Sequence, residues 1–228
     1  MRTLALALAF FLVQSIGSAQ DMWKYFSPDD FAARRARVME QIGDGIAILL
    51  AADNNEGYIQ FRQDNNFYYL SGVEVPGAVL VLNGKTKTSV LMIPDNVPVD
   101  LKDEAIIKPG KEAAVQYKVS SVISKSAMTS YLLHFSQLGQ PFYIVMAPEE
   151  TIEMSRDRCL DLRAERLSDP WDGRIAKEVN FFNKLKERFP ALIIKDLTPM
   201  LDNMRWVKDD KEIAVLRVCG KMGALVFY

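Results

Sequence analysis

His134 is the single histidine of the 228-residue chain and the first side chain to consider for metal or acid–base chemistry. It lies in an apolar stretch predicted to be helical, and no second histidine or carboxylate occurs at the spacing that places two ligands on one helical face. A serine triad needs a histidine close to an exposed nucleophile, and the chain contains no Gly-x-Ser-x-Gly elbow. We therefore interpret His134 as a structural residue.

Two other kinds of polar pattern could carry chemistry. Gly84-Lys85-Thr86 matches the end of a phosphate-binding loop, but Val79 stands where that pattern requires its first glycine. Paired acids occur at Asp29-Asp30, Glu149-Glu150 and Asp209-Asp210. Each pair is interpreted as the start of a helix, where carboxylates cap free backbone N–H groups. The sequence alone assigns no catalytic, cofactor-binding or metal-ligating residue.

Charge and cysteine content narrow the possible partners. The formal net charge of −1 gives no general attraction to nucleic acid or to an anionic membrane, because phosphate binding requires clustered positive charge. Two cysteines, Cys159 and Cys219, are too few for a disulfide framework, and we expect no bridge between them. Cys219 falls within an apolar helical pattern, so a buried free thiol is expected there.

The first 19 residues have the pattern of a secretory signal peptide. Arg2 gives a positive start, residues 4–16 carry no charge and are mostly apolar, and residues 17–19 are small, as a signal peptidase requires. A buried amino-terminal helix is the alternative, but the stretch has no charged face and is too short to span a bilayer. We expect residues 1–19 to be removed on export to the periplasm or outside the cell, with a mature chain from about Gln20.

The mature chain opens with a helix and then a buried strand. Ser27, Pro28 and the two acids that follow predict a helix start, and Gly43 predicts its end. Residues 46–52 form a continuous apolar run, which is typical of an interior strand covered on both faces.

Later segments continue this alternation. Residues 78–82 and 89–93 predict a hairpin whose loop contains Asn83-Gly84. Further strands are predicted at 120–123, 142–146 and 192–194, and further helices at 126–138 and 175–189. Helices that alternate with strands, together with one hairpin, predict a layered α/β domain with a mixed sheet.

The run at residues 61–72 (FRQDNNFYYLSG) is the most distinctive segment. Phe67 and Tyr69 are predicted to alternate onto the core face of a strand, Arg62 to pair with Asp64, and Gly72 to form a turn. The alternative is direct contact with a substrate, since an arginine beside asparagines at a strand end can line a cleft.

The carboxyl-terminal residues predict a helix with an uncovered apolar face. Asp209-Asp210 can cap it, and apolar residues continue to the end of the chain without a closing turn. Such a face needs a partner surface. We expect one domain over residues 22–205, and a junction at 206–228 that ends inside the first helix of a following domain.

Four segments together are similar to one known family. They are Phe31 with Arg34 and Arg35, the run at 61–72, the strand at 76–82, and residues 204–208 with Glu212-Ile213. They resemble the N-terminal domain of aminopeptidase P, the Xaa-Pro aminopeptidases of the creatinase and prolidase group. The resemblance implies a three-layer α-β-α sandwich around a mixed sheet, of ribonuclease-H-like type, followed by a separate pita-bread catalytic domain that this chain lacks.

The resemblance also implies a function. In such enzymes two metal ions, often manganese, are held in the catalytic domain by two aspartates, a histidine and two glutamates, and cleavage releases the residue before proline. The N-terminal domain of such enzymes oligomerises and forms a wall of the substrate cleft. This chain is therefore expected to be inactive alone. Its expected partners are the catalytic domain and other copies of itself, and it is expected to meet a peptide substrate only together with the catalytic domain. Residues 101–110 lack the Glu-x-Trp-x-Gly segment common in the family. The alternative function is a secreted, non-catalytic binding or dimerisation module of the same fold.

Overall fold

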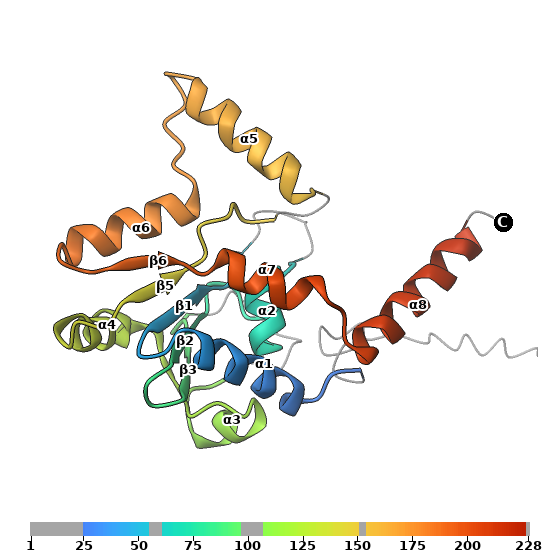
Figure 1. The fold of residues 1–228 in the computed structure, drawn as a ribbon, viewed down its shortest axis with the longest axis horizontal. Helices are drawn as coiled ribbons and strands as arrows, with labels where there is room; N and C mark the ends of the chain where they lie inside the picture. Colours follow the sequence, from blue (N-terminus) through green and yellow to red (C-terminus); the bar gives the residue numbers. More distant parts are fainter. Residues whose placement is uncertain (1–24, 55–60, 97–106, 151–153, 227–228) are drawn as a thin grey trace, which may run out of the picture.

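The computed structural model describes residues 25–54, 61–96, 107–150 and 154–226. Within these ranges six strands form one mixed sheet in the order β4-β3-β2-β1-β5-β6 (Figure 1). The strands are β1 (Ile46–Leu50), β2 (Val79–Asn83), β3 (Thr88–Ile93), β4 (Ser121–Ser124), β5 (Phe142–Ile144) and β6 (Ile194–Asp196). The β1–β2 and β2–β3 pairs are antiparallel and the other three pairs are parallel. The predicted mixed sheet and hairpin are therefore confirmed.

Strand β1 lies inside the sheet, as its apolar run predicts. Ile48 pairs with Val81 of β2 on one side and with Ile144 of β5 on the other. Because successive side chains of a strand point to opposite faces, Ala47 and Leu49 belong to one apolar core, and Ile46 and Ile48 belong to a second.

Helices cover both faces of the sheet and make three layers (Figure 1). The helices are α1 (Pro28–Gln41), α2 (Asn65–Ser71), α3 (Lys111–Gln116), η3 (Lys125–Ala127), α4 (Met128–Gln137), α5 (Arg156–Ser168), α6 (Lys177–Arg188), α7 (Thr198–Trp206) and α8 (Asp210–Val226). Val38 of α1, Phe67 of α2 and Leu201 of α7 pack in the first core. Leu132 of α4 and Leu185 of α6 pack in the second core. This arrangement is the predicted α-β-α sandwich.

Helix α1 begins and ends as predicted. The Ser27 backbone N–H donates to Asp30 Oδ2 at 2.7 Å, and the Ser27 hydroxyl donates to the same oxygen at 2.9 Å. Gly43, at φ +59°, follows the helix in the left-handed conformation that favours glycine. Between these ends, Phe31 and Val38 are buried at 1% and 0% exposure.

The predicted strand at 61–72 is wrong. Residues Asn65–Ser71 form helix α2, whose N-cap is Asp64 and whose C-cap, Gly72, has φ +65°. The Phe67 N–H donates to Asp64 Oδ1 at 2.8 Å. Asp64 is therefore a cap and not the ion-pair partner predicted for Arg62, which donates to Asn65 Oδ1 at 3.4 Å.

Other differences concern segments with weak apolar patterns. Helices α3, α5 and α7 were not predicted, and β6 begins at Ile194, where the predicted strand 192–194 ends. The predicted signal peptide lies outside the described residues. In the part of the chain that the structure describes, no helix has both the length and the apolar character needed to cross a bilayer.

Candidate functional site

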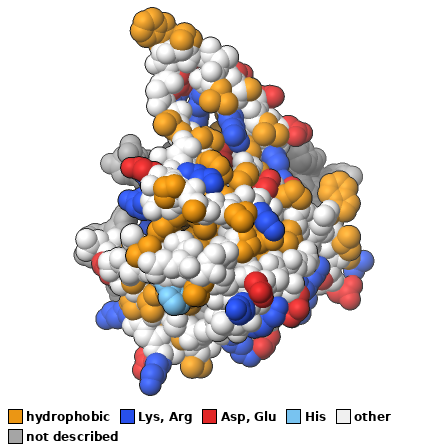
Figure 2. All heavy atoms as spheres, turned by 60° about the vertical axis from the view of Figure 1, so that its left-hand side comes forward, with side chains coloured by type: hydrophobic (Ala, Val, Ile, Leu, Met, Phe, Trp, Pro, Cys, Tyr) orange, Lys and Arg blue, Asp and Glu red, His pale blue; other side chains and the backbone are white. Residues whose placement is uncertain are grey.

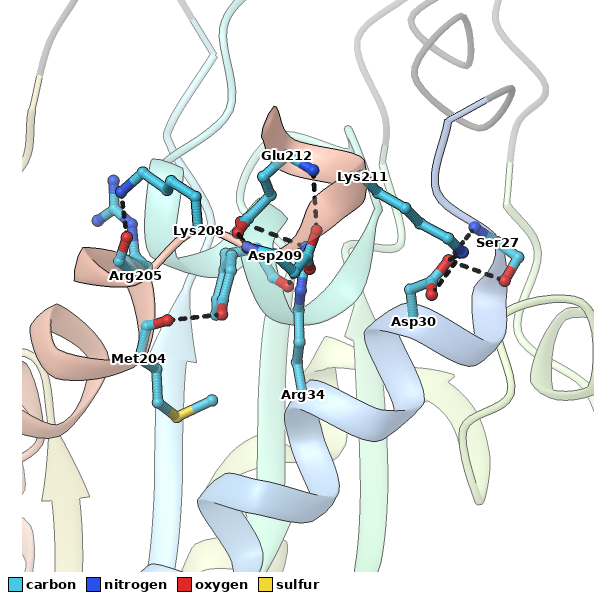
Figure 3. Close-up of polar contacts among 10 residues, drawn as sticks. Ser27, Asp30, Arg34, Met204, Arg205, Lys208, Asp209, Lys211 and Glu212 are labelled. Atoms are coloured by element: carbon cyan, nitrogen blue, oxygen red, sulfur yellow. Dashed lines mark hydrogen bonds and ion pairs between the residues drawn. The ribbon is translucent and has the colours of Figure 1, made fainter. Parts of the chain in front are cut away.

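The candidate site is the junction where α7, α1 and α2 hold the first turn of α8 (Figure 3). Helix α8 starts beside the amino-terminal part of α1 and then points away from the sandwich (Figure 1). Because α8 meets the sandwich at this junction, the contacts made here determine the direction in which α8 leaves the domain.

Arg34 is the central side chain of this junction. Its Nη2 lies 3.3 Å from Asp209 Oδ2 and 3.3 Å from Glu212 Oε1, while its side chain is only 7% exposed. The guanidinium carbon lies 4.2 Å from the centroid of the Tyr69 ring and 4.8 Å from that of Phe26. A planar guanidinium can stack on aromatic rings and pair with carboxylates at the same time, so Arg34 ties α8 to α1 and α2.

The first turn of α8 is closed by a reciprocal capping box. The Glu212 N–H donates to Asp209 Oδ1 at 2.8 Å, and the Asp209 N–H donates to Glu212 Oε2 at 2.9 Å. This confirms the prediction that Asp209-Asp210 marks a helix start. The sequence analysis did not include Glu212 in this cap, although the Asp-x-x-Glu spacing from Asp209 to Glu212 is visible in the sequence.

A second ion pair joins α8 to α1. Lys211 Nζ donates to both carboxylate oxygens of Asp30, at 2.7 and 2.8 Å. Burial raises the pKa of Asp30, but hydrogen bonds from Lys211 and Ser27 outweigh burial and hold that pKa below its ordinary value. The Asp30 carboxylate is thus stabilised in its charged form by both helices.

Helix α7 leads into the junction and is held to α2 by hydrogen bonds. Met204 is 4% exposed, and its carbonyl oxygen accepts a hydrogen bond of 3.1 Å from the Tyr69 hydroxyl. Arg205 Nη1 donates to Asn66 Oδ1 at 2.7 Å, and Lys208 Nζ donates to the Arg205 carbonyl oxygen. The chain is therefore held to α2 up to the residues just before α8.

Beyond its first two turns, α8 has an uncovered apolar face. Leu216, Met222 and Leu225 are 55%, 62% and 79% exposed. A hollow of about 260 Å³ between α8 and α2 is lined by Phe26, Phe31, Arg34, Asn65, Tyr68, Tyr69, Arg205, Lys208, Glu212, Val215 and Leu216. The predicted apolar face is confirmed, but the expectation of a buried Cys219 is wrong: its thiol is exposed because this part of α8 packs on nothing among the described residues.

A second polar cluster lies at the carboxyl ends of β1 and β5. Glu150 accepts a hydrogen bond of 2.5 Å from Asn65 Nδ2 and one of 3.1 Å from Arg156 Nε, and Arg156 also pairs with Asp202. Glu150 and its neighbour Glu149 follow β5 and precede Ser155, which caps α5, so the interpretation of this acid pair as a helix start is wrong. The polar cluster joins α2, α5 and α7, and sequence reasoning missed it because its members are far apart in the chain.

Glu149 lines a small pocket in this cluster, whose wall contains both apolar and charged side chains. Lys177 Nζ lies 3.4 Å from Glu149 Oε1 and 3.1 Å from Asp53 Oδ2, and it donates to the Ala51 carbonyl oxygen at 2.8 Å. Burial raises the pKa of Glu149, and Lys177 offsets only part of that effect. Within the described ranges, no three histidine, cysteine, aspartate or glutamate side chains are placed to hold a metal ion, so these residues do not fit the implied metal pair.

The remaining candidate residues lie apart from the junction. His134 is exposed on α4, where the single histidine is seen in pale blue at the surface (Figure 2), and its ring centroid lies 5.1 Å from that of Phe135. Cys159 is buried in α5 and its thiol is free. Gly84-Lys85-Thr86 forms the hairpin turn, where Asn83 Oδ1 accepts from the N–H groups of Lys85 and Thr86. Most of the segment 101–110 lies outside the described residues.

A protein-family model fits the central part of this fold. Residues 31–142 match the model described as aminopeptidase P, N-terminal domain. Residues 31–142 of this chain belong to that family. The aminopeptidase P N-terminal domain thus contains Arg34 and the whole of α1 after its first turn, whereas α7 and α8 lie beyond the matched residues.

Relatives of known sequence agree with this assignment. A probable Xaa-Pro aminopeptidase of Coccidioides posadasii is 26% identical over 183 residues, covering 80% of this chain and 33% of that protein. A probable Xaa-Pro aminopeptidase of Ajellomyces dermatitidis is 33% identical over 170 residues, covering 72% of this chain and 29% of that protein. The chain spans about a third of the length of these relatives.

Solved structures show the same fold. Aminopeptidase P of Escherichia coli superimposes with a TM-score of 0.58 at 22% identity, over 87% of this chain and 43% of that chain. Its zinc-substituted form, in complex with product, gives 0.57 at 23% identity over the same shares. Proline aminopeptidase P II of Yersinia pestis gives 0.55 at 21%, over 87% and 44%. The fold is therefore that of the creatinase and prolidase N-terminal domains.

Proposed function

We propose that this chain is the N-terminal accessory region of an exported Xaa-Pro aminopeptidase, a metal-dependent exopeptidase that releases the residue before proline. The observation that carries the proposal is helix α8, which Arg34 holds at its first turn and whose Leu216, Met222 and Leu225 remain uncovered. The similar proteins are about three times as long as this chain. A domain that follows the matched region, as in these relatives, could cover the exposed apolar face of α8.

In this proposal the chemistry belongs to the catalytic domain. A pair of divalent ions, manganese or a similar metal, would polarise the peptide carbonyl and lower the pKa of a bound water. The zinc-substituted Escherichia coli relative supports a metal-dependent reaction. The present chain would contribute the wall of the substrate cleft and contacts between copies of the enzyme, and it would act on a peptide only together with the catalytic domain.

Peptidase activity tests the proposal. The 228-residue chain, incubated with manganese and an Xaa-Pro peptide, is expected to release no amino-terminal residue. The same region joined to the proposed catalytic domain is expected to cleave that peptide when manganese is added. Metal-dependent cleavage by the chain alone, or a stop codon directly after Tyr228, would overturn the proposal and leave the non-catalytic module as the better description.

A further inference from the structure

Among the residues that the structure describes, the contacts of α8 with the rest of the chain are confined to its first two turns. Glu212, Ile213 and Val215 are half-buried, whereas every described side chain from Leu216 to Leu225 is exposed. Residues 207–209, which connect α7 to α8, have no regular secondary structure. A helix held only at one end, after a non-helical connection, takes its direction from the contacts at that end.

Those contacts include three ion pairs. Arg34 pairs with Asp209 and Glu212, and Lys211 pairs with Asp30 of α1 (Figure 3). These three ion pairs involve Asp209, Lys211 and Glu212 at the start of α8 and all reach α1, so together they restrain rotation as well as translation of the helix. Arg34 is nearly buried, while Lys211 and Asp30 keep 50% and 25% of their side chains exposed.

We propose that Arg34 and the Asp30–Lys211 pair form a clamp that sets the direction in which α8 leaves the domain. In the proposed peptidase, on which this inference rests, these side chains are positioning residues, which act by orienting the catalytic domain relative to this domain. The remaining connection, residues 207–209, is then the hinge that moves when the clamp opens. Salt weakens the exposed Asp30–Lys211 pair first, because exposed charges are screened by ions.

The clamp can be tested in the full chain by measuring distances between two spin labels. The exposed Cys219 of α8 takes one label, a cysteine at the exposed Ser130 of α4 takes the other, and Cys159→Ala removes the third thiol. In the otherwise unchanged chain we expect one narrow distance distribution. Lys211→Glu, which places like charges beside Asp30, is expected to broaden and shift it.

Matched variants separate the clamp from general effects of charge. Lys221→Glu makes the same charge change on the exposed outer part of α8 and is expected to leave the distribution narrow. Arg34→Met is expected to broaden it more than Arg34→Lys, which keeps the charge but not the planar stacking. Circular dichroism verifies that each variant is folded; if Arg34→Met unfolds, Lys211→Glu alone decides.

The outcome is read independently of peptidase activity. Equal distributions in the unchanged chain, Lys211→Glu and Lys221→Glu would overturn the clamp even if the longer protein is a peptidase. Broadening by Lys211→Glu but not by Lys221→Glu would support it even if no peptidase activity is found.

Discussion

At the scale of single residues, two adjacent arginines of α1 have different roles. Arg34 points to the junction with α8, whereas Arg35 is buried in the sandwich at 1% exposure. Arg35 donates to the carbonyl oxygens of Leu70, Tyr117 and Lys118 at 2.8, 3.2 and 2.6 Å. Burial lowers the pKa of Arg35 to about 10. Its charge is satisfied by backbone oxygens that join α2 and the end of α3 to α1.

Arg35→Met is expected to lower the free energy of unfolding by about 3 kcal/mol, because three carbonyl oxygens lose their donor in a buried site. Arg37→Met, on the exposed side of the same helix, should change it by less than about 0.5 kcal/mol. Urea unfolding of both variants measures the difference. Equal effects would show that the backbone contacts of Arg35 contribute little.

Two glycines with positive φ give a matched pair of substitutions. A Cβ on Gly72 would lie 2.4 Å from Phe31 Cε2, whereas a Cβ on Gly43 would meet nothing within 4 Å. Both positions have φ near +60°, so alanine is strained at each. Gly43→Ala is expected to destabilise by about 1 kcal/mol and Gly72→Ala by about 2–4 kcal/mol, the excess being overpacking against Phe31. Thermal unfolding of both variants tests this, and similar losses would contradict the contact.

Glu149 and Glu150 are expected to respond oppositely to neutralisation. The folded-state pKa of Glu149 is raised, so its stabilising contribution belongs to the protonated form and is lost as pH rises through that pKa. Glu149→Gln should therefore increase the free energy of unfolding near neutral pH, and the gain should shrink as acid protonates the native glutamate. Glu150→Gln should destabilise by about 1–2 kcal/mol, because Asn65 and Arg156 lose a charged acceptor. Urea unfolding at neutral and mildly acidic pH measures both, and a loss of stability in Glu149→Gln would refute the first expectation.

At the scale of elements, apolar pattern predicted the strands better than the short helices. The apolar runs of β1, β2 and β3 are continuous because these strands are buried on both faces of the sheet. Such short, continuous apolar runs are readily recognised as strands. Alternation of Phe67 and Tyr69 suggested a strand, but Asp64 as N-cap and Gly72 as C-cap enclose a seven-residue helix. The capping residues favour a helix there, because a segment of seven residues is too short for its apolar pattern to distinguish the helical period from the strand period. Helix α5 was missed because it has only one buried residue, Cys159, and no apolar stripe facing a core.

The apolar face of α8 has its own consequence. Replacing Leu216, Met222 and Leu225 by glutamine should reduce concentration-dependent association of the chain, because these side chains are uncovered in the structure. Size-exclusion chromatography at several concentrations measures the effect. Truncation near Asp202 is a poorer test, because it removes the buried Met204 along with α8. Unchanged association of the triple variant would mean that another surface is responsible.

At the scale of the whole molecule, sequence patterns and family resemblance predicted different features of the fold. Sequence patterns predicted the mixed sheet and four of the eight described α-helices, namely α1, α4, α6 and α8. The family resemblance predicted the three-layer α-β-α order. It also included Arg34 and Glu212 among the matching residues, and in the structure these two side chains form an ion pair although they are 178 positions apart in the chain. The polar cluster around Glu150 could not be predicted, because its contacts depend on how α2, α5 and α7 are placed around the sheet.

Hydrogen exchange of α8 tests the central claim most directly. The account predicts that the amides of α8 beyond residue 216 exchange faster than those of the buried helix α1 in the 228-residue chain, because nothing among the described residues covers them, although this segment remains mostly helical. When this chain is joined to the proposed catalytic domain, the same amides should exchange much more slowly, because that domain would pack on the apolar face of α8. Equally fast exchange in both proteins would contradict the account, since α8 would then have no partner surface in the enzyme.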